Sequence, residues 1–352
     1  MNKLFSFDQN ASNFYVSEVA LYEPNIDKTA PHILVRLQKV GLSTFEMLQI
    51  LSEVTGVKVR DIGYAGLKDK KSTSEQFITL PSSINLESKI QILESKNITI
   101  KAIAPFQNKL KIGHLKGNNF KIILKIKDES RLKRAIESLQ KCPIFPNYFG
   151  AQRFGKDGAN FEEAKALLSG QKNIKSRKIS SFLISSLQSY LFNNYLALRM
   201  EFNKILSLKD AKSAHIFLNE HNISIKESEL DDVFLQESFF KILDGDLCMH
   251  YPFGRIFMYA RSDLIRFLDF EIAPVGILPG HSIKKLSSGL AGDFFEFCKS
   301  DIKIPSPGGY RFIYAKIHDL DANFKNDVLE LSFYLPRGCY ATVVLEQIAK
   351  MG

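Results

Sequence analysis

Two widely separated segments alternate apolar and polar residues, and this alternation is the feature that most constrains the fold. Residues 120–127 read FKIILKIK and residues 329–335 read LELSFYL. A period of two residues is typical of a strand with one buried face. Residues 161–168, 179–205 and 209–220 show helical periodicity instead. The sequence therefore predicts a sheet formed from both ends of the chain and interrupted by a mainly helical insertion.

Glycine-rich and turn-rich segments predict where this insertion begins and ends. The helical block follows GAQRFGKDG at residues 150–158 and ends near PSPGGY at residues 305–310. We expect one discontinuous domain at residues 1–151 and 313–352, and an inserted domain at residues 152–312. A chain of 352 residues with 45% hydrophobic content is long enough for about two cores.

The charge of the chain favours an anionic partner. Lys and Arg number 47 against 38 Asp and Glu, which gives a formal net charge of +9. Seven of the lysines lie between residues 101 and 127. Such a cluster suits nucleic acid or an anionic membrane surface. It equally describes the solvated face of a strand, and the residues alone do not separate these two interpretations.

Other features argue against a membrane or metalloprotein class. No apolar run approaches the roughly 20 residues that span a bilayer, and residues 1–10 lack the apolar region of a signal peptide. We expect a cytoplasmic protein. The cysteines and histidines are scattered, so neither a disulfide framework nor a metal site is predicted. The cysteines are Cys142, Cys248, Cys298 and Cys339.

The segment GYAGLKDKKSTSEQF, residues 63–77, carries a candidate catalytic carboxylate. Asp69 lies among Lys68, Lys70 and Lys71 on a glycine-containing stretch. Neighbouring cations favour an ionised carboxylate, which can act as a nucleophile or as a base. The alternative is a solvated surface turn. The spacing alone favours the turn.

A second segment, GAQRFGK at residues 150–156, nearly matches the phosphate-binding pattern G-x-x-x-x-G-K-[ST]. The next residue is Asp157, where a nucleotide-binding loop needs a hydroxyl to hold Mg²⁺. The residues before the loop also include Pro143 and Pro146, which do not read as a buried strand. A nucleotide-dependent enzyme is therefore disfavoured. A structural hinge held by the neighbouring aromatic residues is the simpler interpretation.

Four short elements, taken together and in order, are similar to the signatures of a known family. They are GLKDK at residues 66–70, KGNNF at residues 116–120, NYFGAQRFG at residues 147–155 and LPRGCYATVVLEQI at residues 335–348. This set resembles the TruD family of tRNA pseudouridine synthases. The resemblance covers essentially the whole chain.

The resemblance implies a fold and an activity. The fold would be α+β, with a pseudouridine-synthase catalytic domain built on a mixed, largely antiparallel sheet and interrupted by the family's helical domain. The activity would be the conversion of uridine 13 of tRNA to pseudouridine, with Asp69 as nucleophile or base and without a cofactor or metal. The implied partner is tRNA, and no obligate protein partner is evident. The sequence gives no sign of oligomerisation, so we expect a monomer.

The resemblance also supplies the predicted contacts to the substrate. An enzyme that acts on a base within folded RNA extrudes this base and holds it by stacking. The resemblance implies this stacking role for Phe120 and a supporting hydrogen bond from Asn118. Without it, Phe120 is simply the first inward residue of its strand. The other predicted substrate contacts are Tyr340, Lys68, Lys70, Gln152 and Arg153.

The sequence departs from the family at its N-terminus. Family members carry a lysine several residues before a P-x-D-F-x-V-x-E stretch, and the corresponding position here is Asp8. A basic role at this position must pass to another residue, such as Lys3, or be absent. The main rival hypothesis is a non-catalytic RNA-binding protein with a basic groove. The retention of Asp69 argues against this rival.

Overall fold

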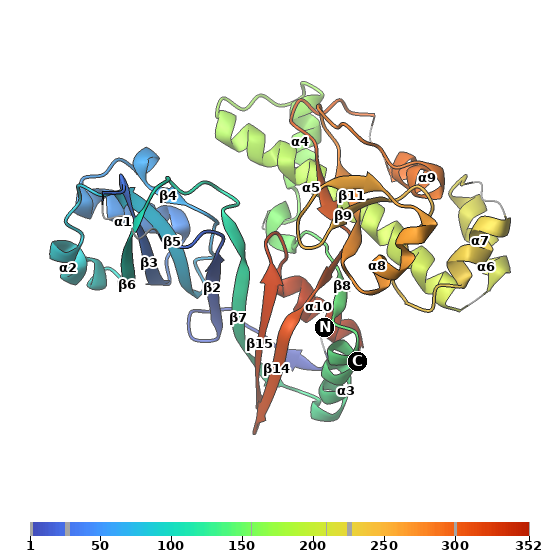
Figure 1. Ribbon diagram of the computed structural model, residues 1–352, viewed down its shortest axis with the longest axis horizontal. Coiled ribbons are helices and arrows are strands. Elements are labelled where there is room, and N and C mark those ends of the chain that lie inside the picture. The colour runs from blue at the N-terminus through green and yellow to red at the C-terminus, as the bar shows by residue number, and fades with distance from the viewer. Residues whose placement is uncertain are drawn as a thin grey trace. The chain divides into compact units, whose positions relative to one another are not determined.

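The chain is divided between two structural units (Figure 1). The computed structural model describes residues 3–24, 29–155, 157–208, 210–223, 227–298 and 301–351. The first unit comprises Met1–Pro143 and Lys316–Gly352, and the second comprises Ile144–Ala315. The predicted boundaries differ from these by eight residues (151 against 143) and by three residues (312 against 315). The assignment of catalysis to the first unit stays a prediction.

The first unit is built on one mixed sheet with the strand order β14-β15-β7-β2-β5-β3-β6. β2 and β5 are parallel, whereas the other neighbours on this path are antiparallel. The predicted α+β class, with its mixed and largely antiparallel sheet, is confirmed. The strands are β1 (Phe5–Ser6), β2 (Phe14–Ala20), β3 (His32–Val40), β4 (Gly63–Tyr64), β5 (Thr73–Pro81), β6 (Ile98–Phe106), β7 (Leu115–Ile126), β14 (His318–Lys325) and β15 (Val328–Pro336).

The two alternating segments are β7 and β15, which pair with each other from Val328–Lys125 to Pro336–Gly117. Ile122 and Leu124 of β7 and Leu331 of β15 are fully buried, whereas Lys121 and Lys125 are exposed. β7 begins at Leu115, five residues before the predicted strand (120 against 115). The preceding residues KGNN also belong to the strand, although they carry no apolar alternation that would predict one.

Helices cover the sheet of the first unit. α1 (Thr44–Thr55) begins at a capping box in which Ser43 and Glu46 bond each other's backbone, as predicted, and it ends at Gly56 with a φ of 76°. α1 and α2 (Ile90–Glu94) pack their apolar side chains against β3 and β5. α3 (Glu129–Lys141) and α10 (Ala341–Met351) contact each other near β14 and β15 (Figure 1). Two short 3-10 helices, η1 (Val59–Asp61) and η2 (Glu87–Lys89), complete this unit.

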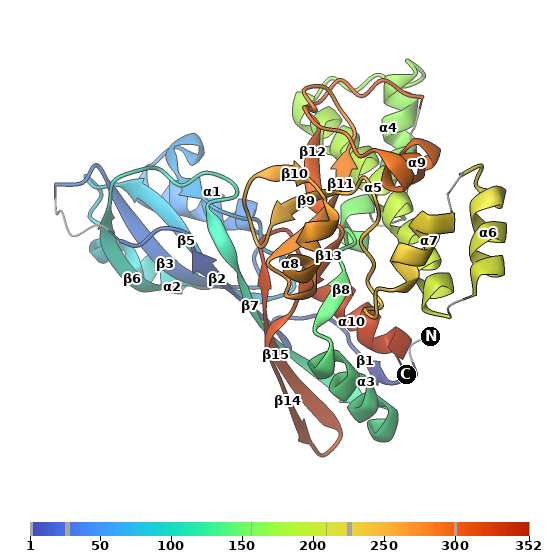
Figure 2. The ribbon, with the colours of Figure 1, turned by 45° about the vertical axis from the view of Figure 1, so that its right-hand side comes forward.

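The second unit is organised around the long helix α5 (Arg177–Ser207), which lies between β11 and α6 (Figure 2). The predicted helices at 161–168, 179–205 and 209–220 correspond to α4, α5 and α6. A small four-stranded sheet of order β10-β9-β11-β12 accompanies them. The remaining elements are η3 (Ala151–Phe154), α4 (Asn160–Leu168), α6 (Ala211–Glu220), α7 (Glu227–Phe234), η4 (Arg261–Asp263), α8 (Leu264–Leu268), α9 (Gly289–Cys298), β8 (Ile144–Pro146), β9 (Leu247–His250), β10 (Ile256–Met258), β11 (Ile272–Leu278), β12 (Gly309–Phe312) and β13 (Tyr314–Lys316).

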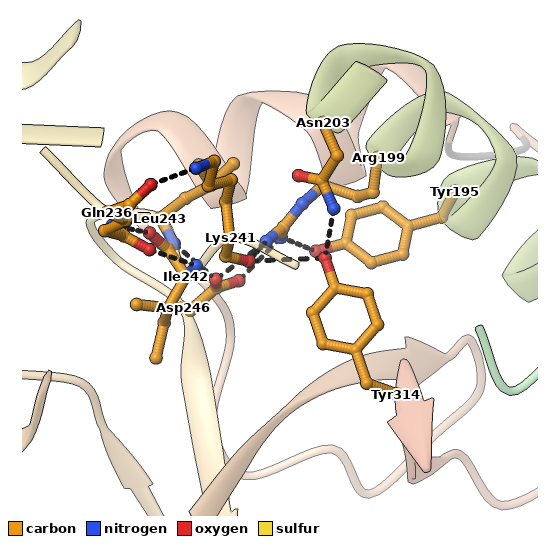
Figure 3. A network of polar contacts seen from close by, with 9 residues as sticks. All are labelled: Tyr195, Arg199, Asn203, Gln236, Lys241, Ile242, Leu243, Asp246 and Tyr314. Atoms are coloured by element: carbon orange, nitrogen blue, oxygen red, sulfur yellow. Dashed lines mark hydrogen bonds and ion pairs between the residues drawn. The ribbon is translucent and has the colours of Figure 1, made fainter. Parts of the chain in front are cut away.

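A buried polar network ties α5 to the strands of the second unit (Figure 3). The Arg199 guanidinium is fully buried and binds both carboxylate oxygens of Asp246, at 2.7 and 2.9 Å. It also donates to the Tyr195 hydroxyl at 2.7 Å. Asn203 donates to the Tyr314 hydroxyl at 2.8 Å. Because a buried charge is costly without partners, this bidentate pairing is what allows an arginine in the core.

Candidate active site

Asp69 lies on the loop between β4 and β5, at the end of the central strands of the first unit. Its backbone carbonyl accepts hydrogen bonds from Lys39 Nζ at 3.1 Å and from Ser72 Oγ at 2.7 Å. Its side chain is exposed, and no residue of the described ranges makes a hydrogen bond or ion pair with its carboxylate. The backbone is thus held in place while the carboxylate remains available.

The loop occupies this place because β2 and β5 separate. They pair only from Tyr15–Thr73 to Ser17–Glu75, and β4 takes over the pairing with β5 further along, at Gly63–Thr79. Glu18 lies where β2 leaves β5. Its Oε2 accepts a hydrogen bond from the Phe77 backbone N–H at 2.9 Å, so a strand donor without a ladder partner is satisfied.

Lys68 turns inward from this loop. Its Nζ is 2.5 Å from Glu18 Oε1, and the side chains of Lys68 and Glu18 are 5% and 0% exposed. The Lys68 backbone N–H donates to Thr44 Oγ1 at the start of α1, at 2.8 Å. Lys68 therefore positions the loop, because its ammonium is already paired with Glu18 inside the protein. The predicted contact between Lys68 and RNA stays a prediction.

A second buried lysine, Lys39 of β3, was missed in the sequence. It is fully buried and binds the backbone carbonyl of Leu42 as well as that of Asp69. Burial and, to a lesser extent, the nearby Lys68 lower the pKa of Lys39 to about 8, although Asp69 opposes this shift. The alternation of β3 could have revealed it, since residue 39 shares a face with the buried Val35 and Leu37.

The predicted stacking residue Phe120 belongs to an aromatic row across three strands. It is 9% exposed, and its ring lies 6.0 Å from that of Phe14 and 5.5 Å from that of Phe333. Asn118 lies on the same face of β7, opposite Glu18 in the register. Its Oδ1 is buried and lacks a hydrogen-bond partner within the described part of the chain. An unpaired buried acceptor in this position suits a donor from a bound ligand.

Three of the four sequence elements meet in the first unit. Arg337 donates from its backbone to the Lys116 carbonyl at 3.0 Å and from Nη1 to the Gly113 carbonyl at 2.9 Å. The Gly113 N–H in turn donates to Ala65 at 2.8 Å. A Cβ at residue 117 would lie 2.2 Å from the carbonyl oxygen of Leu335, so this crossing requires glycine. The Asp69 segment, KGNNF and LPRG are therefore neighbours in space.

Lys70 and Tyr340 lie at the edges of this arrangement. Lys70 is exposed and pairs with Glu46 at 2.5 Å. The hydrogen bond from Lys70 is the main cause that lowers the pKa of Glu46 to about 2. Tyr340 is half-buried just before α10, and its carbonyl accepts the Val343 N–H at 3.1 Å. Contacts from Lys70 and Tyr340 to the substrate stay predictions.

Comparison with known proteins identifies the family. The model of the family described as "tRNA pseudouridine synthase D (TruD)" matches residues 6–175 and 284–348. The chain belongs to the TruD family. A tRNA pseudouridine synthase D of Helicobacter pylori is 38% identical, over 98% of this chain and 92% of its own length. The Helicobacter hepaticus protein of that name is 40% identical, over 97% of this chain and 92% of its own.

A solved structure agrees with the TruD fold. It is a crystal structure from Methanosarcina mazei assigned as a tRNA pseudouridine synthase D. It matches with a TM-score of 0.65 at 18% identity, covering 97% of this chain and 92% of that one. At this low identity the likeness concerns the fold alone. It extends through both units of the present chain.

The fourth TruD-like element, NYFGAQRFG, belongs to the second unit. Arg153 lies in η3 and donates to Ser185 Oγ at 2.8 Å and to Ser189 Oγ at 3.2 Å, both on α5. Gln152 is exposed. These bonds support the hinge interpretation, and contacts from Gln152 and Arg153 to RNA stay predictions. Lys156, which ends the motif resembling a nucleotide-binding loop, lies outside the described residues.

The missing N-terminal lysine of the TruD pattern is not replaced by Lys3. Lys3 precedes β1, which pairs with β7 at Lys125 and Ile126. Lys125 is seven residues from Asn118 (125 minus 118), or roughly 24 Å along a strand at about 3.4 Å per residue. Besides the lysines of the Asp69 loop itself, Lys39 is a basic residue that the structure places against this loop.

The described residues contain no group of three or more His, Cys, Asp or Glu side chains arranged to hold a metal ion. The four cysteines are free thiols. Within the same residues, no helix is long and apolar enough to cross a membrane.

Proposed function

We propose that this protein is a tRNA pseudouridine synthase and that Asp69 is its essential carboxylate. One observation carries the proposal: an exposed carboxylate, which has no hydrogen-bond or ion-pair partner among the described residues, lies on a fixed loop where three TruD-like elements meet. Relatives that match over nearly the full chain are named tRNA pseudouridine synthase D. Uridine 13 of tRNA is the proposed target, as the resemblance of the motifs implies.

The reaction is an isomerisation, which sets what the site must provide. The bond between the ribose C1′ and N1 of uracil breaks, the base turns, and C5 joins the same C1′ while its proton is lost to N1 or solvent. Product and substrate have the same composition, so no electron or group donor enters the balance. Asp69 can act as a nucleophile on the ribose or base, or as a base that removes the 2′ proton of the ribose.

The surroundings of Asp69 suit a negatively charged reactant. Lys39 and Lys68 are both buried beneath the loop, and of these two, within the described residues, only the Lys68 ammonium is bonded to a carboxylate. Positive charge thus lies beside the exposed carboxylate, where it can stabilise negative charge that develops during the reaction. Asn118 Oδ1, which has no hydrogen-bond partner among the described residues, is available to accept a hydrogen bond from the uracil N3–H. Phe120 supplies an aromatic surface on the same strand face as Asn118.

Incubation of the purified protein with unmodified tRNA, without added cofactor, tests this proposal. Pseudouridine is mapped by chemical derivatisation and primer extension. We expect one modified site, at uridine 13, and no product when residue 13 of the tRNA is cytidine. If the tRNA is bound but no pseudouridine forms, the rival hypothesis of a non-catalytic RNA-binding protein holds. Modification at another position would support the proposed activity but refute uridine 13 as its target.

The remaining expectations follow from the substrate. A tRNA-modifying enzyme acts where tRNA matures, so we propose a cytoplasmic location. We also propose that the protein works as a monomer. Light scattering coupled to size-exclusion chromatography, with and without tRNA, tests the second point. A dimeric mass in the absence of RNA would refute it.

A further inference from the structure

An open pocket of about 690 Å³ lies in the first unit, apart from the Asp69 carboxylate. Its walls are Tyr22–Pro24, which follow β2, and residues between Phe106 and His114, which connect β6 to β7. Pockets that take small ligands measure about 300–1,000 Å³. None of its lining residues takes part in the site described above.

The pocket presents an aromatic pair. The Tyr22 ring is 5.3 Å from the His114 ring at an interplanar angle of 84°, and Tyr22 is 47% exposed. His114 Nδ1 accepts the Lys111 N–H at 3.3 Å, so a neutral His114 ring carries its proton on Nε2. The pocket thus offers an aromatic surface beside a nitrogen donor. Every nucleobase has a face that stacks on such a surface.

The charge around the aromatic pair is positive. Among the described lining residues, Lys109 and Lys111 carry positive charge and Glu23 carries the one negative charge. Lys109 donates to the backbone carbonyl of Arg60, whereas Lys111 is exposed. The exposed Arg337 is bonded to Gly113 at the same loop. A phosphate next to a stacked base would meet these cations.

The pocket wall is connected to the segment that carries Asp69. The Leu110 N–H donates to Thr79 Oγ1 of β5 at 3.0 Å, and the Gly113 N–H donates to the Ala65 carbonyl at 2.8 Å. Ala65 precedes Asp69 by four residues (69 minus 65). A ligand in the pocket therefore contacts a loop that is hydrogen-bonded to the segment carrying Asp69.

We propose that this pocket binds one unpaired nucleotide of the RNA substrate, separate from the target uridine, with its base against Tyr22 and its phosphate near Lys111. The identity of the RNA rests on the proposed function. The binding itself does not require turnover, so it can be measured even if no pseudouridine forms.

The first test uses a fluorescent reporter, because the chain contains no tryptophan. Tyr22→Trp places a single indole in the pocket, and Ile92→Trp places one on the exposed side of α2 as a control. We expect tRNA to quench the first protein and not the second. Retained fluorescence of the Tyr22→Trp protein, under conditions where filter binding shows saturation with tRNA, would overturn the proposal.

Free AMP and UMP form a second arm of this test. Quenching by tRNA with weak or absent quenching by free nucleotides supports an RNA contact. Quenching by a free nucleotide but not by tRNA overturns it, because the pocket would then be a site for a small molecule.

Charge and ring deletions provide an independent test. Tyr22→Ala is expected to raise the Kd for tRNA about 5- to 150-fold, the range of one base–aromatic stack. Lys111→Glu should raise Kd and also flatten its dependence on salt by about one phosphate contact. Lys96→Glu, at an exposed lysine of the same unit, is the matched control and should leave Kd within twofold. Equal Kd values for all three variants and the parent would refute the pocket as an RNA site.

Discussion

Two buried ion pairs, one in each unit, compensate charges that are removed from water, but they have different consequences for the protein. Arg199 and Asp246 are both 0% exposed and bind each other through two hydrogen bonds, so their charges are enclosed. Lys68 and Glu18 are buried as well, but they support a loop whose Asp69 carboxylate faces solvent without a described partner. The first pair only stabilises a fold, whereas the second also positions a reactive group. Their mutational signatures should therefore differ.

The largest effect should come from Asp69→Asn, which removes charge and basicity but keeps the shape. Loss of a catalytic base or nucleophile typically costs 10²- to 10⁴-fold in rate, so kcat should fall by about 10³-fold or more. Stability should change by less than about 0.5 kcal/mol because the side chain is exposed. Pseudouridine yield and a urea unfolding curve measure the two quantities. An active Asp69→Asn protein would exclude Asp69 as the essential group.

The enclosed pair should show the opposite behaviour. Arg199→Met leaves Asp246 buried without its cation, and breaking such a pair typically costs about 3–5 kcal/mol of unfolding free energy. The matched control is Lys172→Ala, which removes a surface pair with Glu163 at 2.8 Å. This change should cost less than about 1 kcal/mol. If both variants unfold at the same urea concentration, the Arg199 network does not stabilise the second unit.

Glu18→Gln tests the Lys68–Glu18 pair, which both stabilises the fold and positions the Asp69 loop. The amide oxygen can still accept the Phe77 N–H, but Lys68 loses its counter-charge, so we expect a loss of about 2–4 kcal/mol. Turnover should fall as well, by about 10-fold or more at temperatures where the variant is folded, because the Asp69 loop loses its anchor. Glu75→Gln is the control, since its pair with Arg36 is partly exposed. Full activity in folded Glu18→Gln protein would separate the pair from the site.

The sequence predicted structural features that depend on neighbouring residues, but it did not predict contacts between residues that are far apart in the chain. The capping box at Ser43 and the alternation in β7 are local, and both were confirmed. The expected contact between Lys68 and the substrate stays a prediction, but the ion pair of Lys68 with Glu18, fifty residues away (68 minus 18), was not predicted from the sequence. That contact exists only because β2 and β5 run parallel and then separate. No pattern within either segment reveals this pairing.

The smallest expected effect concerns Lys39, which should make the free energy of unfolding depend on pH. Its pKa is lowered from 10.5 to about 8 on folding. Between pH 8 and 10.5 the unfolded chain binds the extra proton, so the stability of the parent should rise with pH relative to Lys39→Met. The slope cannot exceed about 1.4 kcal/mol per pH unit, the value for one proton. Below pH 8 both states are protonated and the difference should become constant.

Urea unfolding of both proteins at several pH values from 7 to 10 measures this difference directly. Lys96→Met is the control, because Lys96 is exposed and its removal should leave the pH dependence of the parent intact. The comparison cancels the titration of all other groups, which the proteins share. A constant difference across the whole range would mean that Lys39 keeps an ordinary pKa. The buried charge beneath Asp69 would then be as permanent as that of Arg199, and the contrast between the two units would rest on the exposure of Asp69 alone.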